Sequence, residues 1–393
     1  MENVVIIEGA RTPVGKFLGA FADTPAVDLG VAATKEALRR ANVQPEQVEE
    51  LVYGHARQAG NGPNGARQVS YFAGIPQETN AYTVNMACAS GSKAVQLAAD
   101  QIALGNHEIA VAGGMENMTQ VPFLLPKYRF GYRMGDVAVP DAMYTDGFTC
   151  RLCGLVMGET AENLARQYDI SREEQDAFAL ESQQKAESGK ERRAAEMFPI
   201  EVPGKKRGTT TEITADEHPK ADSTMEGLAR LKPVFDPEAG TVTAGNASGI
   251  TDGAASLVLM SEARAKAEGR EPLAKIVAYA QAGVDPAYMG IAPVPATHKV
   301  LEKTGLQMSD FGVVEINEAF AAQVIACDRE LKFDHDRLNV KGGAIAVGHP
   351  IGMSGARIIL SAAYEMRDQG HSLGLATLCV SGGQGMSFVL ERA

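Results

Sequence analysis

One pattern occurs twice in this chain, about 263 residues apart. Residues 35–52 combine an amphipathic helix, a turn and a strand, and residues 298–315 repeat this order. The apolar positions of the two copies agree at a constant offset of 263: Leu38 with Leu301, Val43 with Leu306, Val48 with Phe311, and Leu51 with Val314. Because this period is that of a domain, it predicts two similar halves and excludes a solenoid of short repeats.

A second pair of segments extends the repeat. Ser90–Lys93 matches Ser354–Arg357 at an offset of 264, and each begins a predicted helix, over 90–104 and 354–368. Each helix precedes an apolar run, 109–112 and 375–380, that predicts a buried strand, and residues 1–8 predict the first strand. Strands that alternate with helices are typical of α/β sheets covered by helices.

An irregular stretch, 120–248, separates the two halves. It contains a polar helix whose start has the pattern of a capping box, Ser171 and Glu174. It also contains a predicted hairpin, 202–211, with the basic tip Lys205-Lys206-Arg207. Insertions of this kind commonly carry ligand and subunit contacts.

The composition narrows the class of protein. The net charge of −12 argues against nucleic acid as the main partner. No stretch reaches about 18 uninterrupted apolar residues and the first residues lack the pattern of a signal peptide, so neither a membrane span nor secretion is expected. Five cysteines in 393 residues argue against a disulfide framework and favour the reducing cytoplasm, where free thiols can do chemistry.

Two glycine-rich turns carry residues suited to nucleophilic catalysis. Cys88 precedes Ser90, a favourable helix N-cap, so the thiol is predicted at a helix N-terminus. There the helix dipole would lower the pKa of the thiol, and free N–H groups could hold an oxyanion. His349, between Gly348 and Pro350, is a candidate base, since cysteine and histidine are the minimal set for a thiolate nucleophile. The alternatives are a buried structural cysteine and a structural histidine.

Two further residues stand at the ends of predicted strands. Cys379 ends an apolar strand and precedes the turn Ser381–Gly385, and Asn317 lies between a strand and a helix. Cys379 could be a core cysteine and Asn317 a simple N-cap. A second thiol, however, offers a proton carrier that a hydrolase does not need. The set of residues therefore indicates carbon–carbon bond chemistry on a thioester.

Other motifs carry less information. Cys150 and Cys153 form a lone C-x-x-C, for which a zinc site would need a second pair and a thioredoxin-like site another setting. The clusters 113–118 and 245–249 predict turns. The glycines at 342–348 fit neither a dinucleotide-binding nor a P-loop fingerprint.

Taken together, the segments from Val5 to Val389 resemble the thiolases. The resemblance rests on seven pieces in order: Asn85–Gly91, Gly113–Met118, Met157–Asn163, Thr241–Ser248, Asn317–Phe320, Gly348–Pro350 and Cys379. It implies an α/β fold of two βαβαβαββ halves stacked as five layers (αβαβα). The implied domains are 1–119 plus 249–270, an inserted loop domain at 120–248, and 271–393.

For the site, the resemblance implies an acyl-accepting nucleophile at Cys88, whose proton goes to His349. Cys379 would then move a proton to and from the α-carbon of a second thioester. The enolate oxygen would be held by His349 and by a water on Asn317. The oxygen of the acyl-enzyme would lie on the backbone N–H groups of Cys88 and Ser381.

Coenzyme A is the implied carrier, as substrate and product, with no permanently bound cofactor and no metal. The residues that the resemblance places along the coenzyme A slot are Met157, Lys220, Phe235, Ser248, Met289, Ala319 and Phe320. The implied partners are acetyl-CoA, acetoacetyl-CoA and further copies of the chain. A dimer or a dimer of dimers is expected, because residues 126–136 are similar to the loop that builds tetramers in this family.

Two positions depart from the family pattern. Ser381 stands where the family usually has glycine, and serine would be strained there if the backbone needs a positive φ. Val156 stands where family members acting on acetoacetyl-CoA often carry histidine. The second departure leaves the preference for the shortest substrate open.

The sequence therefore predicts an acyltransferase that reversibly condenses two acetyl-CoA molecules to acetoacetyl-CoA and CoA through an acyl-cysteine. One alternative is a degradative thiolase for longer 3-ketoacyl-CoA substrates. A non-catalytic acyl-CoA-binding relative is a remote alternative, since Cys88, His349 and Cys379 are all present. A cysteine hydrolase would need water to enter the acyl site.

Overall fold

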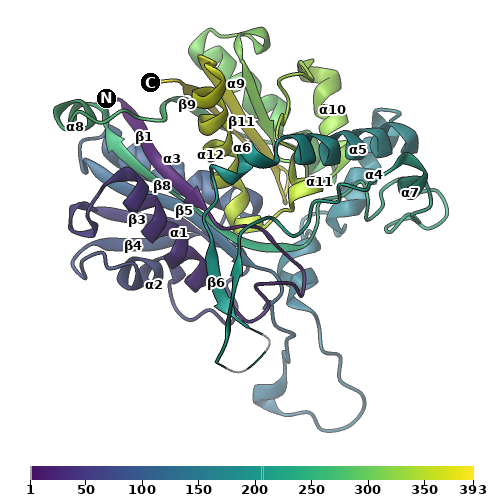
Figure 1. Ribbon diagram of the computed structural model, residues 1–393. Helices are drawn as coiled ribbons and strands as arrows, with labels where there is room; N and C mark the ends of the chain where they lie inside the picture. The colour runs from purple at the N-terminus through teal and green to yellow at the C-terminus, as the bar shows by residue number, and fades with distance from the viewer. Residues whose placement is uncertain (1, 205, 207) are drawn as a thin grey trace.

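The computed structural model describes residues 2–204, 206 and 208–393. In Figure 1 the N-terminal part of the chain, in purple and blue, lies beside the C-terminal part, in yellow and green, and strands of both parts belong to one sheet. Lys205 and Arg207 of the predicted basic tip lie outside the described residues. The flanking strands β6 (Ile200–Pro203) and β7 (Thr210–Ile213) pair antiparallel, which confirms the predicted hairpin.

The first half has the predicted order βαβαβαββ. Its elements are β1 (Val4–Arg11), α1 (Ala26–Ala41), β3 (Glu50–Gly54), α2 (Gly65–Phe72), β4 (Asn80–Val84), α3 (Ser90–Ala103), β5 (Ile109–Asn117) and β8 (Thr251–Ser261). β5 and β8 are buried along their whole length, as strands covered on both faces are. The insertion enters between these two strands.

The second half repeats this order with one strand reduced. Its elements are β9 (Ala274–Gly283), α9 (Pro293–Thr304), β10 (Val313–Ile316), α10 (Ala321–Leu331), α11 (Ala344–Val347), α12 (Ile351–Gln369), β11 (Leu373–Val380) and β12 (Gln384–Glu391). Where the first half has β4, the second half has a single parallel bridge, between Leu338 and Val314. The duplication predicted from the offset of 263 is confirmed, since α1 and β3 correspond to α9 and β10.

The strands of both halves form one hydrogen-bonded path in the order β10-β11-β12-β9-β1-β8-β5-β3-β4, and the short β2 (Gly15–Lys16) pairs with β8. Within each half the arrangement is the same: β3 is parallel to β5 as β10 is to β11, and β8 and β12 run antiparallel to their neighbours. The halves meet where β1 pairs with β9, at Val4 opposite Ile276.

The helices complete five layers. α1 packs on β1, β5 and β8 from one side, and α9 packs on β9 and β12 from the other. α3 and α12 pack on each other between the halves and contact strands of both. α12 is buried without interruption from Ile351 to Met366, because a helix packed between the strands of the two halves has no solvent-facing side. The five-layer fold expected from the sequence is thereby confirmed.

The sequence-based prediction of a turn at 113–118 is wrong. Gly113 and Gly114 lie inside β5, which continues to Asn117. A Cβ at Gly114 would collide with the carbonyl of Gly352 on α12, so glycine is required by the close approach of a helix backbone to the strand. The cluster 245–249 is a turn and loop, as predicted.

Gly114→Ala should destabilise the protein by about 3 kcal/mol or more, because backbone on both sides must shift to admit the methyl group. Gly283→Ala is a matched control, since its Cβ would meet nothing closer than the Gly383 carbonyl at 3.8 Å. Urea unfolding of both variants measures the difference. Equal midpoints for the two variants would contradict this account of the β5–α12 contact.

The insertion supplies helices, a hairpin and an exposed arm. Its helices are α4 (Met157–Gln167), α5 (Arg172–Ser188), α6 (Lys190–Ala194) and α7 (Met225–Ala229), and α8 (Glu262–Ala267) follows β8. The capping box at the start of α5 is confirmed, since Ser171 and Glu174 each accept the backbone N–H of the other. The arm, residues 123–139, projects from the body in Figure 1 and exposes several aromatic side chains. Among the described residues, no helix has the length and apolarity needed to cross a membrane.

Candidate active site

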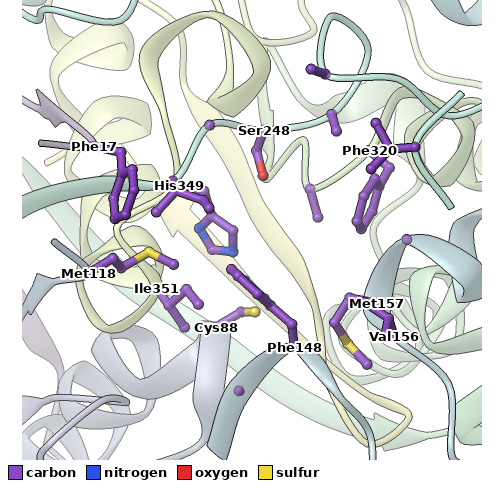
Figure 2. A pocket seen from close by; sticks show the side chains of 18 of the residues that line it. Phe17, Cys88, Met118, Phe148, Val156, Met157, Ser248, Phe320, His349 and Ile351 are labelled. Atoms are coloured by element: carbon purple, nitrogen blue, oxygen red, sulfur yellow. The ribbon is translucent and has the colours of Figure 1, made fainter. Parts of the chain in front are cut away.

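A cavity of about 670 Å³ lies where the two halves and the insertion meet. Cys88 comes from the first half, His349 and Ser381 from the second, and all three line the cavity. In Figure 2 the sulfur of Cys88 and the imidazole of His349 point into the same space, with Phe148 beside them. The structure thus brings together residues that are more than 250 positions apart in the sequence.

Cys88 lies in a single 3₁₀ turn, Ala87–Ala89, between β4 and α3. Ala87 has a left-handed backbone, φ +43°, which is strained for a residue with a Cβ. Ser90 is the first residue of α3 rather than its N-cap, which is Ala89. The Ser90 hydroxyl instead accepts the N–H of Met86 at 2.9 Å and donates to the carbonyl of Ala87 at 2.7 Å. The serine therefore holds the turn that carries the thiol.

The expectation of a lowered pKa for Cys88 is wrong. Burial raises the pKa of the thiol, although hydrogen bonds from the N–H groups of Ser381 and of Cys88 itself, and the positive charge of Arg57, act in the opposite direction. The sequence shows the helix N-terminus but not the desolvation, which depends on the walls of the cavity. The two N–H groups predicted to form an oxyanion hole do face one point, the Cys88 sulfur.

His349 precedes α12, which begins at Ile351, three residues before the predicted start. Its Nδ1 lies 2.6 Å from the Ser354 hydroxyl, which donates to the carbonyl of Pro350 at 2.9 Å. With the hydroxyl proton used in this way, Nδ1 carries the ring proton and Nε2 is left as an acceptor. Burial lowers the pKa of His349 to about 3, so the imidazole is neutral at ordinary pH.

Asn317 follows β10 directly and is not a helix N-cap, since α10 begins later with Phe320 as its cap. Its Nδ2 lies 3.4 Å from Nε2 of His349. Its Oδ1 is buried and has no hydrogen-bond partner among the described residues. A buried acceptor without a partner is a place where a water is expected to bind.

Cys379 ends β11 and is fully buried. It does not itself line the cavity but packs with Met157, Met289 and Phe320, which do. Burial and the nearby charge of Cys88 raise the pKa of Cys379 well above its ordinary value. The second thiol therefore lies near the first, packed among side chains that form the cavity wall.

The residues assigned to the coenzyme A slot all line this cavity: Met157, Lys220, Phe235, Ser248, Met289, Ala319 and Phe320. The backbone of Ser381 does not have a positive φ; the left-handed positions are Gly382 and Gly383, at +87° and +79°. Serine in place of the usual glycine therefore causes no strain of this kind.

Other residues that line the cavity were not singled out from the sequence. They include Arg57, Met118, Tyr144, Phe148, His218 and Ile351. Arg57 could have been found, because it follows β3 at the edge of the sheet where β4 ends before Cys88. The aromatic residues belong to the insertion, where the sequence gives no strand end to mark the site.

Cys150 and Cys153 do not line the cavity but pack behind some of the residues that do. They pack in the cluster that contains Cys379 and Met157, and the Cys153 thiol hydrogen-bonds to Cys150. Within residues 2–204, 206 and 208–393, no group of three or more histidine, cysteine, aspartate or glutamate side chains is arranged to hold a metal ion.

The class of protein follows from the fold, the site and comparison with protein families. The family model of the thiolase N-terminal domain matches residues 4–263, and that of the thiolase C-terminal domain matches residues 270–392. The chain belongs to the thiolase family, as the sequence motifs indicated.

Individual relatives cover the whole chain. An acetyl-CoA acetyltransferase of Escherichia coli (strain K12) is 50% identical over 395 residues, with 100% of both chains covered. A probable acetyl-CoA acyltransferase of Staphylococcus epidermidis is 45% identical, with 100% of this chain and 99% of the other covered. The crystal structure of the Bacillus anthracis acetyl-CoA acetyltransferase has a TM-score of 0.96 at 44% identity, over 100% of this chain and 99% of that one.

Proposed function

We propose that this thiolase reversibly condenses two acetyl-CoA molecules to acetoacetyl-CoA and CoA through an acetyl group on Cys88. The observation that carries the proposal is the placement of Cys88, His349 and the Ser381 N–H on one cavity, with Cys379 directly behind its wall. Full-length similarity to proteins named acetyl-CoA acetyltransferase supports acetyl-CoA as the substrate.

In the first half-reaction, Cys88 attacks the thioester carbonyl and forms the acyl-enzyme. The unprotonated Nε2 of His349 takes the thiol proton and returns it to the departing CoA sulfur. The N–H groups of Cys88 and Ser381 hold the carbonyl oxygen as it becomes negative. Acyl transfer is thereby separated from the formation of the carbon–carbon bond.

In the second half-reaction, Cys379 first passes its thiol proton to Nε2 of His349, and the resulting thiolate removes a proton from the α-carbon of the incoming acetyl-CoA. The enolate oxygen is held by the His349 side chain and by a water on Oδ1 of Asn317. For this step the imidazole carries on Nε2 the proton that it received from Cys379, and Nδ1 keeps its own proton beside the Ser354 hydroxyl. The enolate carbon then attacks the acyl group on Cys88, and the Cys88 sulfur leaves and takes the Nε2 proton of His349. This step releases the 3-ketoacyl-CoA and returns both thiols and the neutral imidazole to their starting states.

A degradative thiolase for longer acyl chains is the second candidate, and Val156 is the observation that favours it. This apolar side chain lines the cavity where a histidine was expected for an acetoacetyl-CoA enzyme. Met118, Phe148 and Ile351 surround Cys88 in Figure 2, however, and a long acyl chain would have to displace them. Their packing supports a short acyl group.

A series of 3-ketoacyl-CoA substrates tests the proposal. We expect CoA-dependent cleavage to have the highest kcat/KM with acetoacetyl-CoA and to fall at each added pair of methylenes. A maximum of kcat/KM at six or more acyl carbons would favour a degradative thiolase for longer acyl chains instead. The condensation direction is measured separately, as acetoacetyl-CoA formed from acetyl-CoA alone.

The pH dependence of cleavage should lack a histidine inflection. Because the pKa of His349 is lowered to about 3, its basic form persists as the pH falls and is lost only near pH 3. We expect kcat/KM to rise with pH through a single thiol-like step, since burial raises the pKa of Cys88. An inflection between about pH 6 and 7 that coincides with titration of the His349 ring, followed by NMR, would contradict this.

For partners, we propose coenzyme A thioesters and further copies of this chain. The exposed arm supports a dimer of dimers, since Phe130 and Met134 are 87% and 95% exposed in the single chain. We also place the enzyme in the cytoplasm, on the grounds of its free thiols and its coenzyme A substrates. Mass in solution distinguishes a dimer from a tetramer, and deletion of residues 126–136 should reduce a tetramer to dimers.

A further inference from the structure

Arg57 lies beside the nucleophile and takes no part in the mechanism above. It follows β3 directly after His55 and Ala56, lines the cavity, and is only 7% exposed. Its guanidinium lies against the backbone of Gly147, where a Cβ would collide with it. Its position is therefore fixed by close packing against the insertion and not by an ion pair.

The guanidinium lacks the partners that a buried charge normally has. Among the described residues no carboxylate lies within 4 Å of it, and its buried Nε has no hydrogen-bond partner. The backbone N–H of Arg57, by contrast, donates to Glu116 at 3.0 Å. A buried positive charge without an anion is costly, so its retention in a cavity wall indicates that an anion is present there during function.

Four titratable or charged groups face the Cys88 thiol from the surrounding elements. They are Arg57 after β3, Glu116 on β5, His349 before α12, and Cys379 on β11. His349 is neutral at ordinary pH because burial lowers its pKa to about 3. Cys379 is a neutral thiol in the resting state because its pKa is raised well above the ordinary value. Only Arg57 and Glu116 therefore carry charge toward Cys88.

Glu116 opposes Arg57, but its charge is already satisfied. It accepts the N–H groups of Ala56, Arg57 and Gly352 at 2.9–3.1 Å, and Nε2 of His55 lies 3.2 Å away. On the pKa of Cys88, the lowering effect of Arg57 exceeds the raising effect of Glu116. The net field of the two charges at the sulfur is positive.

We propose that Arg57 is a positioning residue for catalysis, whose buried, unpaired guanidinium stabilises the thiolate form of Cys88. The missing anion is the nucleophile itself, formed when the thiol loses its proton. The proposal deepens the proposed function, on which it rests for the role of Cys88. It also explains how a thiol in a desolvated pocket can ionise beside an imidazole that binds protons weakly.

The proposal is tested by measuring the rate at which iodoacetamide alkylates Cys88 in the intact protein at a series of pH values. The alkylated peptide is quantified by mass spectrometry. We expect Arg57→Met and Arg57→Gln each to raise the apparent pKa of Cys88 alkylation by about one unit, so that the rate at pH 7 falls about tenfold. Arg57→Lys should recover most of the loss. Arg151→Met, which removes an exposed guanidinium from the turn after Cys150, should leave the profile unchanged.

A second reagent distinguishes the effect of the charge at position 57 from the effect of the side chain's shape. Iodoacetate is anionic, so its rate relative to iodoacetamide should drop in Arg57→Met and Arg57→Gln and stay high in Arg57→Lys. Unchanged alkylation profiles in both neutral variants overturn the proposal. Unchanged profiles together with dissociation of the oligomer would show that Arg57 stabilises a contact between subunits instead of the Cys88 thiolate.

The two proposals fail in distinguishable ways. If Cys88 is not the nucleophile, incubation with labelled acetyl-CoA will leave Cys88 without an acetyl group in the native protein and in every Arg57 variant. If only the role of Arg57 is wrong, Cys88 is acetylated in the native protein and its alkylation profile does not depend on position 57.

Discussion

Cys88→Ala should abolish acyl-enzyme formation and reduce turnover by at least about 10⁴-fold, because it removes the thiol that lies in the cavity beside the backbone N–H groups of Cys88 and Ser381. The measurement is mass spectrometry of the intact protein after incubation with acetyl-CoA. The native chain should gain one acetyl group on the peptide containing Cys88, and the variant should gain none. Neither His349 nor Ser381 is expected to replace the Cys88 thiol as the nucleophile.

Two variants control for indirect effects of this substitution. Cys153→Ala removes a half-buried thiol that packs against the same cluster as Cys379. The thiol has no role in the proposed mechanism, so this variant should keep near-native turnover. Cys88→Ser keeps the shape of the side chain but replaces the thiol with a far weaker nucleophile, so it should behave like Cys88→Ala. Acetylation of the Cys88→Ala variant at another residue, with turnover retained, would remove Cys88 from the mechanism.

The fold could be predicted from the sequence because its strongest signals are local and occur twice. The apolar positions Leu38 and Leu51 recur as Leu301 and Val314, and in the structure they lie on equivalent elements, α1 and α9 or β3 and β10. Amphipathic helices and apolar strands depend on nearest neighbours along the chain, so a repeated pattern predicts a repeated unit. The order of the five layers was predicted from the resemblance to the thiolases, because the repeated apolar pattern does not determine it.

What the sequence did not give depends on contacts between distant segments. Gly114 was interpreted as a turn residue, although it is a strand residue that lets the backbone of Gly352 approach. The pairing of β1 with β9, which joins the two halves, has no sequence signal either. Both features are set by how two elements pack, and each element alone would tolerate other residues.

In the candidate site, too, the sequence predicts the local features but not those set by contacts between distant segments. Cys88, His349 and Cys379 could be named because each stands at the end of a strand or the start of a helix, where loops of α/β folds gather functional groups. The pKa of Cys88, the tautomer of His349 and the unpaired state of Arg57 could not, because they depend on burial and on hydrogen bonds from other segments. Ser354, which orients His349, was noted only as a helix start.

Cys379 is fully buried and burial raises its pKa, so the thiol keeps its proton in the free enzyme and cannot act as a base there. Part of the elevation comes from the charge on Cys88, which shares the space around it. Acylation of Cys88 prevents that charge from forming, although the larger effect of burial remains. Cys379 should therefore ionise more readily after the first half-reaction, which favours the proposed order of the two steps.

Cys379→Ala should separate the two half-reactions: the variant should still acetylate Cys88, while turnover falls by roughly 100- to 10,000-fold, the range expected for loss of a general acid–base group. Exchange of the α-protons of acetyl-CoA with deuterium, followed by NMR, should be detectable in the native enzyme and absent in the variant. Cys327→Ala is the control for loss of a buried thiol, because Cys327 is equally buried, packs in a different core cluster from Cys379 and donates to the carbonyl of Gly290. Normal turnover by Cys379→Ala, or loss of acetylation together with exchange, would assign the second thiol to packing rather than to proton transfer.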